Sequence, residues 1–170
     1  GGTPEQIRKY VPNLLAGKTI GMMSLTESGG GSDAEGNMKT FARRDGDVYL
    51  INGAKRWIGN GTLADVVVLW ARDTEDRQVK GFLVDKGTPG YEAKVIQGKG
   101  SLRALWQADI ALTDVRIPAE NWLPGANSFK DSARVLASTR AACSWMALGH
   151  AVAAYDAALS YTSQRNQFGK

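Results

Sequence analysis

The first stretch of the chain, residues 3–16, carries apolar side chains at helical spacing. Thr3 and Gln6 are spaced as a capping box, and Gly17 follows the stretch as a helix stop. The pattern therefore predicts a helix over 3–16. The apolar positions of its shared face are Ile7, Tyr10, Val11, Leu14 and Leu15.

Residues 18–125 show a β pattern, with short runs of β-branched, aliphatic and aromatic residues broken by Gly, Pro, Asn and Asp. Asp45-Gly46 separates two such runs, and this dipeptide is a strong signal for a two-residue hairpin turn. Six or seven antiparallel strands in a barrel or sandwich are expected, and the lack of alternating helices argues against a Rossmann sheet. Further strands are predicted at 65–72, 81–86, 91–97 and 108–117.

After Pro124-Gly125 the chain becomes rich in alanine, and its apolar positions recur at helical spacing. One long helix, or two, is predicted over 133–165. A continuous helix would be on the order of 50 Å long and would need partner helices to bury it. The predicted fold class is therefore α+β, with an antiparallel β-barrel or sandwich flanked by an N-terminal helix and one long C-terminal helix.

Composition narrows the function classes. The 170 residues are 43% hydrophobic and carry a net charge of +4, spread without a basic tract that could follow a phosphate backbone, so no nucleic-acid partner is expected. No apolar run reaches the roughly 18 residues of a membrane span, and no membrane insertion is expected. The lack of an initiator Met or signal sequence suggests an excised piece of a soluble intracellular protein, from the cytoplasm of a bacterium or the mitochondrial matrix or peroxisome of a eukaryote.

Cys143 and His150 are the chain's one cysteine and one histidine. A single cysteine excludes an intramolecular disulfide, and its alanine-rich surroundings predict a buried structural thiol. His150 has no second ligand at metal-binding spacing, so no metal site is predicted.

Two short motifs carry the candidate chemistry. Residues 25–33, Leu-Thr-Glu-Ser-Gly-Gly-Gly-Ser-Asp, place hydroxyls and unhindered amides at a strand end, which suits an anionic ligand. Residues 52–60 add a large planar aromatic, Trp57, on the next β-rich segment. Each motif has an ordinary alternative, a flexible loop for the glycines and a core position for Trp57. Together they predict a flavin pocket.

In order along the chain, five segments resemble the acyl-CoA dehydrogenase family, and the resemblance covers essentially all 170 residues. By this resemblance, 1–18 is the end of an N-terminal helical domain, 19–125 is a flavin-binding β-domain, and 126–170 is the start of a C-terminal helical domain. The five segments are 2–12, 25–33, 52–60, 114–121 and 165–170.

The resemblance also implies site residues. FAD would contact Met23, Ser24, Leu25, Thr26, Gly31, Ser32, Trp57, Ile58 and Gly59. The FAD of a neighbouring subunit would contact Arg165, Gln167 and Phe168, which implies a homo-oligomer, either a dimer or a tetramer. The acyl-CoA substrate would contact Ser32, Ser138, Thr139 and Arg140, where an arginine suits phosphates.

The implied reaction is α,β-desaturation of an acyl-CoA, in which a carboxylate removes the α-proton and a β-hydride passes to flavin N5. In the family the base lies in the C-terminal helical domain, beyond Lys170. No catalytic residue is therefore assigned, and the isolated piece is expected to be inactive. Electron-transfer flavoprotein or dioxygen would accept the electrons.

Two positions depart from the family pattern. Gly59 stands where dehydrogenases usually have Thr and where acyl-CoA oxidases often have Gly, so an oxidase is an alternative. Ser28 replaces a usual Pro, which is expected to loosen the loop slightly. Residues 80–86, 97–103 and 123–125 look most like the glutaryl-CoA dehydrogenase and short-chain oxidase branch, which indicates a short-chain or dicarboxylic acyl-CoA. An alternative of another class is a non-enzymatic β-domain with a helical stalk, used as an interaction module.

Overall fold

The computed structural model describes residues 1–169, and the chain divides into two compact units between Asp131 and Ser132. The first unit contains α1 (Pro4–Leu15), the short α2 (Ala34–Asn37), the 3-10 helix η1 (Ala119–Asn121) and all of the strands found in the described residues. These strands are β1 (Gly21–Ser24), β2 (Phe41–Asp45), β3 (Val48–Gly59), β4 (Val66–Asp73), β5 (Val79–Asp85), β6 (Tyr91–Val95) and β7 (Gln107–Pro118).

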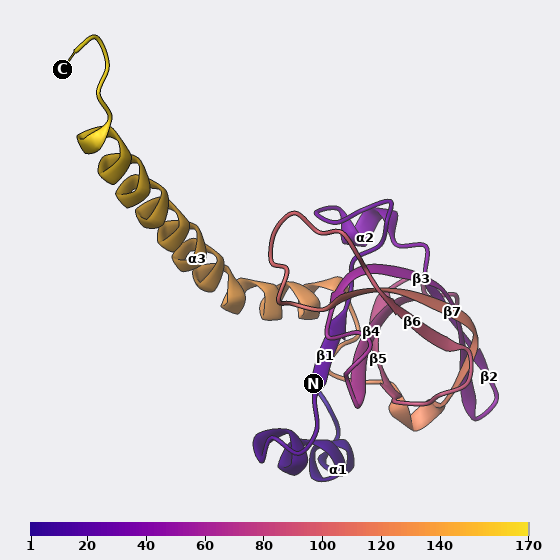
Figure 1. The fold of residues 1–170 in the computed structure, drawn as a ribbon. Coiled ribbons are helices and arrows are strands. Elements are labelled where there is room, and N and C mark those ends of the chain that lie inside the picture. Colours follow the sequence, from indigo (N-terminus) through magenta and orange to yellow (C-terminus); the bar gives the residue numbers. More distant parts are fainter. Residues whose placement is uncertain (170) are drawn as a thin grey trace. The chain divides into compact units, whose positions relative to one another are not determined.

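The strands form one seven-stranded sheet in the order β1-β4-β2-β3-β7-β6, with β5 on the free edge of β4. Figure 1 shows the sheet curled around its own core. The predicted α+β class with its two flanking helices is confirmed. The sheet is mixed rather than purely antiparallel, because β4 runs parallel to both β1 and β2. Parallel pairing joins strands that are separated in the sequence, so no local sequence pattern predicts it.

The predicted capping box opens α1. The Thr3 hydroxyl accepts from the Gln6 N–H at 3.2 Å, and the Gln6 side chain accepts from the Thr3 N–H at 2.8 Å. Gln6 also attaches the helix to η1, because its Nε2 donates to the carbonyls of Glu120 (2.7 Å) and Trp122 (2.9 Å). Gln6 is the buried residue of α1, whereas Ile7 on the predicted apolar face is exposed. A polar side chain therefore anchors this helix.

The predicted hairpin joins β2 to β3. Asp45 still pairs with Val48, so the two turn residues are Gly46 and Asp47 rather than Asp45 and Gly46. Gly46 has φ of +61°, which glycine adopts without strain. The hairpin is thus confirmed, with its turn displaced by one residue.

The core of the sheet is built by β3, β4, β5 and β7, with Ile51, Leu69, Phe82 and Val115 fully buried. The β5 strand begins at Val79, two residues before its predicted start, because Val79 and Lys80 pair with Arg72 and Ala71 of β4. Lys80 is buried there and forms an ion pair with Asp73 at 2.7 Å.

The second unit is the continuation of α3 (Phe129–Gln164), one uninterrupted helix of 36 residues. The predicted long helix is therefore confirmed as a single element. Its apolar side chains are exposed on several faces, among them Trp145, Met146, Val152 and Tyr155. The predicted domain boundaries at residues 18 and 125 stay predictions.

Candidate functional site

The two sequence motifs lie against each other in the first unit. Thr26 lies two residues after the end of β1, and its hydroxyl donates to the carbonyl of Arg56 in β3 at 2.5 Å. The Arg56 N–H donates back to the Thr26 carbonyl at 2.9 Å. This reciprocal pair joins the glycine-containing loop to the aromatic segment, so both motifs contribute to one site.

Lys55 lies beneath this junction with a fully buried side chain. Its Nζ donates to the Leu25 carbonyl and to Glu27 Oε1, each at 3.0 Å. Burial lowers the pKa of Lys55 to about 8, because the ammonium loses its water, while the nearby Glu27 carboxylate opposes the shift. The cation therefore remains the main form of Lys55 at neutral pH.

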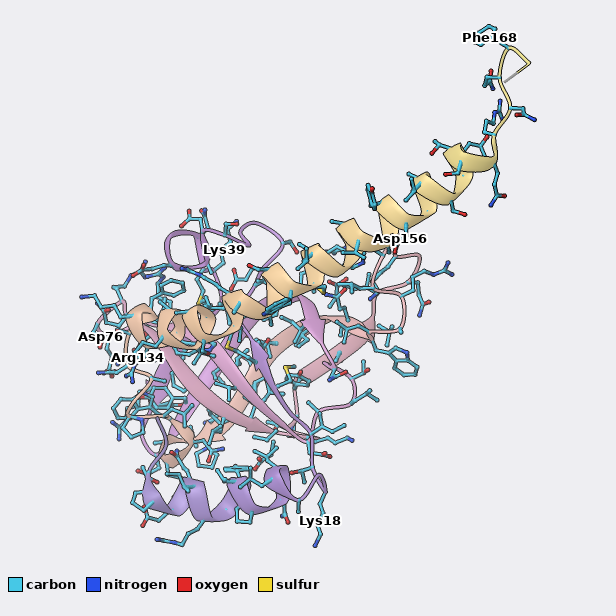
Figure 2. All side chains as sticks on the ribbon, turned by 90° about the vertical axis from the view of Figure 1, so that its left-hand side faces the viewer. Lys18, Lys39, Asp76, Arg134, Asp156 and Phe168 are labelled. Carbon is cyan, nitrogen blue, oxygen red and sulfur yellow. The ribbon has the colours of Figure 1, made fainter. Side chains whose placement is uncertain are left out.

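Glu27 ties the first motif to the segment that precedes β2. Its carboxylate accepts from the N–H groups of Lys39 at 2.8 Å and Thr40 at 3.0 Å, as well as from Lys55. Figure 2 shows Lys39 on the loop after α2. Burial alone would raise the pKa of Glu27, but the hydrogen bonds from Thr40 and Lys39 and the charge of Lys55 together hold it below its ordinary value. Glu27 is therefore ionised, and its carboxylate links three segments of the chain: its own motif, residues 39–40 and β3.

A β-bulge in β3 turns Trp57 outward. Between Lys55 and Ile58 the register with β7 shifts by one residue, and Trp57 takes φ of +62°, which bulky side chains rarely adopt. The indole is 48% exposed. The Arg56 guanidinium lies 5.1 Å from the ring centroid and also pairs with Asp109 at 3.3 Å. The exposed aromatic face is therefore held by backbone geometry and by a neighbouring cation.

The glycine-rich loop presents free backbone donors. Glu27 and Gly30 close a tight turn through two backbone hydrogen bonds, at 3.3 and 3.2 Å. At Gly29 and Gly31 a Cβ would meet no atom within 4 Å, so the loop surface is open there. Within residues 1–169, the N–H groups of Gly31 and Ser32 have no acceptor. Such amides suit a polar or anionic ligand.

Burial divides the predicted flavin contacts into two groups. Ser24, Leu25 and Ile58 have buried side chains, so a ligand could meet only their backbone. The remaining ones in the first unit are partly or fully exposed: Met23, Thr26, Gly31, Ser32, Trp57 and Gly59. The structure thus brings 23–32 and 57–59 together, while their contact with a flavin stays a prediction.

The remaining predicted site residues lie on α3 or after it, in the second unit. Ser138 and Thr139 each donate a hydroxyl hydrogen bond to a carbonyl of their own helix, at 2.7 and 3.0 Å. Arg140 is exposed. Past the helix end, the Arg165 guanidinium donates to the Tyr161 hydroxyl at 2.6 Å. Gln167 and Phe168 follow it, both exposed, and Figure 2 shows Phe168 beyond the end of the helix. Their predicted roles toward CoA and toward a neighbouring flavin stay predictions.

Sequence reasoning missed the segment between β6 and β7 as part of the site. The Asn60 N–H donates to the Trp106 carbonyl at 2.7 Å, and Leu105 lies 3.8 Å from where a Cβ on Gly59 would stand. Trp106 is more than half exposed. These contacts join residues far apart in the chain, and no periodic pattern in this segment marks them in advance.

The prediction of a buried Cys143 is wrong, because its thiol is exposed on α3, where side chains project around the helix. His150 is also exposed, and its Nδ1 lies 2.8 Å from the Met146 carbonyl. Among residues 1–169, no helix combines the length and the apolar character needed to cross a membrane.

The first unit is thus a β-domain built on one curled mixed sheet, in which a glycine-rich turn and an outward indole lie close together. Residues 22–115 match the family model described as acyl-CoA dehydrogenase, middle domain. The chain therefore belongs to the acyl-CoA dehydrogenase family, which the sequence motifs had indicated.

Known relatives match along nearly the whole chain. It is 38% identical over 173 residues to the mitochondrial short-chain specific acyl-CoA dehydrogenase of Mus musculus, covering 99% of this chain and 42% of that protein. It is 36% identical to a subunit of the caffeyl-CoA reductase-Etf complex of Acetobacterium woodii, covering 99% and 45%. Among solved structures, a glutaryl-CoA dehydrogenase from Mycobacterium smegmatis in complex with FADH2 superimposes with a TM-score of 0.87 at 40% identity, covering 99% and 43%. The chain thus spans less than half the length of these relatives.

Proposed function

We propose that this chain is the flavin-binding middle part of an FAD-dependent acyl-CoA dehydrogenase. The observation that supports this most strongly is the junction of Thr26 with Arg56, which sets unpaired amides and an outward Trp57 side by side in one site. Unpaired N–H groups suit the polar edge of a flavin, and an exposed indole suits its flat ring system. The residues present therefore fit FAD.

The residues have different roles in this proposal. The N–H groups of Gly31 and Ser32 and the hydroxyl of Thr26 would hold the cofactor, and Trp57 and Gly59 would lie against its rings. Bound FAD would supply the electron acceptor for α,β-desaturation of the acyl group. The homologous relative solved with FADH2 supports the choice of this cofactor. Arg165, Gln167 and Phe168 would reach the FAD of a neighbouring subunit in a homo-oligomer.

The substrate is proposed to be a short-chain or dicarboxylic acyl-CoA, as the names of the short-chain and glutaryl-CoA relatives suggest. Ser138, Thr139 and Arg140 would bind the CoA part, because a guanidinium pairs with phosphate through two parallel hydrogen bonds. The proton-abstracting carboxylate would lie beyond Lys170. Electron-transfer flavoprotein is the proposed acceptor, supported by the relative from an Etf complex.

The test uses the full-length protein that contains this chain. Its visible spectrum should show bound flavin, and anaerobic addition of butyryl-CoA or glutaryl-CoA should bleach the flavin band. The acyl-CoA that bleaches at the lower concentration identifies the substrate class. A colourless protein that also fails to bind added FAD would refute the proposal and would favour the non-enzymatic interaction module.

An acyl-CoA oxidase is the second candidate, favoured by the surroundings of Gly59. This glycine has no positive φ, and a Cβ there would lie at ordinary contact distance, 3.8 Å, from Leu105. Neither backbone strain nor crowding therefore requires glycine at this position. A path for dioxygen to the flavin, left open by the missing side chain, would explain why glycine occupies position 59.

The oxidase candidate is tested by oxygen consumption with acyl-CoA in the full-length protein. Gly59→Thr should lower the ratio of oxidase to dehydrogenase activity, and Gly59→Ala is the matched control that adds bulk without a hydroxyl. An unchanged ratio in both variants would exclude Gly59 as the oxygen determinant.

A further inference from the structure

The peptide between Leu25 and Thr26 has its two polar groups on opposite sides. Its carbonyl accepts a hydrogen bond from the buried Lys55 Nζ at 3.0 Å. No cis peptide occurs in the described chain, and in a trans peptide the C=O and N–H point in opposite directions. The Thr26 N–H therefore points away from Lys55, and within residues 1–169 it has no acceptor.

Lys55 is the side chain that holds this peptide plane. The Thr26 hydroxyl and carbonyl are both bonded to Arg56, which fixes the next peptide rather than this one. Glu27 Oε1 in turn holds the ammonium at 3.0 Å, and the Lys39 and Thr40 amides hold Glu27. Without the Lys55 ammonium, the Leu25 carbonyl would lose its partner and the peptide could rotate.

We propose that Lys55 is a positioning residue for the cofactor, because it holds the Leu25–Thr26 peptide so that the Thr26 N–H faces the flavin. This inference rests on the proposed flavin site. It assigns the buried ion pair of Lys55 and Glu27 a role in ligand binding, in addition to linking residues 25–27, 39–40 and β3.

A second buried ion pair provides the matched control. Lys80, on β5, pairs with Asp73 at 2.7 Å, and like Lys55 it is a mostly buried lysine within a strand of the sheet. It makes no described contact with residues 25–32. Lys80→Met therefore removes a comparable buried cation without touching the proposed cofactor segment.

The experiment measures FAD affinity in the full-length protein. Apoprotein prepared by removing the flavin is titrated with FAD, and binding is followed by flavin fluorescence and by the visible spectrum of the bound cofactor. Lys55→Met should raise the Kd for FAD by at least about tenfold, which corresponds to about 1.4 kcal/mol, and should alter the bound spectrum. Lys80→Met should keep the Kd within about threefold of wild type. Lys55→Arg, which keeps donors and charge, should recover most of the lost affinity.

Urea unfolding of each apoprotein separates folding from binding. Equal losses of FAD affinity in Lys55→Met and Lys80→Met would overturn the inference, since both would then act through stability. Wild-type affinity in Lys55→Met would also overturn it. If Lys55→Met cannot be purified folded, Lys55→Gln takes its place with the same thresholds. A wild-type protein that binds no FAD would instead refute the proposed function itself.

Discussion

Gly53 lies in the second motif, at a point where β3 comes close to the segment before β2. Its φ is +147°, a conformation that residues with a side chain rarely adopt. A Cβ there would stand 2.5 Å from Thr40 Oγ1 and 2.6 Å from Thr40 Cα. The hydroxyl could rotate away, but the Cα could move only with the backbone. Gly53→Ala should therefore force β3 and Thr40 apart.

Two costs add in this variant. Holding a residue other than glycine in such a backbone conformation lowers the free energy of unfolding by about 1–3 kcal/mol. Overpacking against fixed neighbours costs about another 1–3 kcal/mol. The expected loss in the free energy of unfolding is thus about 2–6 kcal/mol, a large fraction of the 5–15 kcal/mol that typically stabilises a protein. The damage should reach the site, because the Thr40 N–H donates to Glu27 at 3.0 Å.

Urea unfolding of the full-length protein, followed by tryptophan fluorescence, measures this loss. Gly29→Ala is the matched control, because Gly29 has no positive φ and open space around its Cβ position. The control should stay within about 0.5 kcal/mol of wild type. A Gly53→Ala variant that loses less than about 1 kcal/mol would show that Thr40 moves without cost and would refute the reasoning.

Three further predictions concern other contacts and use the same unfolding assay. Thr3→Ala removes the N-cap of α1 and should cost about 1 kcal/mol, whereas Thr3→Ser should restore most of it. Lys80→Met leaves Asp73 buried and unpaired and should cost about 3–5 kcal/mol. Burial keeps the pKa of Lys55 at about 8 in the folded protein, below the ordinary 10.5, so the unfolded chain binds more protons between these values. The stability contributed by Lys55 should therefore rise with pH across this window, and this rise should be absent in Lys55→Met.

Elements with local signals were predictable. The capping box of Thr3 and Gln6 marked the start of α1, and Asp45-Gly46 marked the hairpin to within one residue. The parallel pairing of β1 with β4 was not, because these strands meet across the whole β2–β3 hairpin. The exposure of Ile7 and Leu15 on α1 was also not predicted, since the side chain that anchors this helix is the polar Gln6.

The site shows the same division between local and non-local information. Alternation along β3 places Tyr49, Ile51 and Lys55 on one inward face, so the burial of this lysine, which was not predicted, follows the pattern of the strand. Its partner Glu27 could be identified only from the fold. Continued alternation would also have buried Trp57. The extra residue between Lys55 and Ile58 reverses the parity, so that Ile58 enters the core and the indole turns outward. The bulge thus makes Trp57 available to a flat ligand, and it also explains why the core alternative for this tryptophan fails.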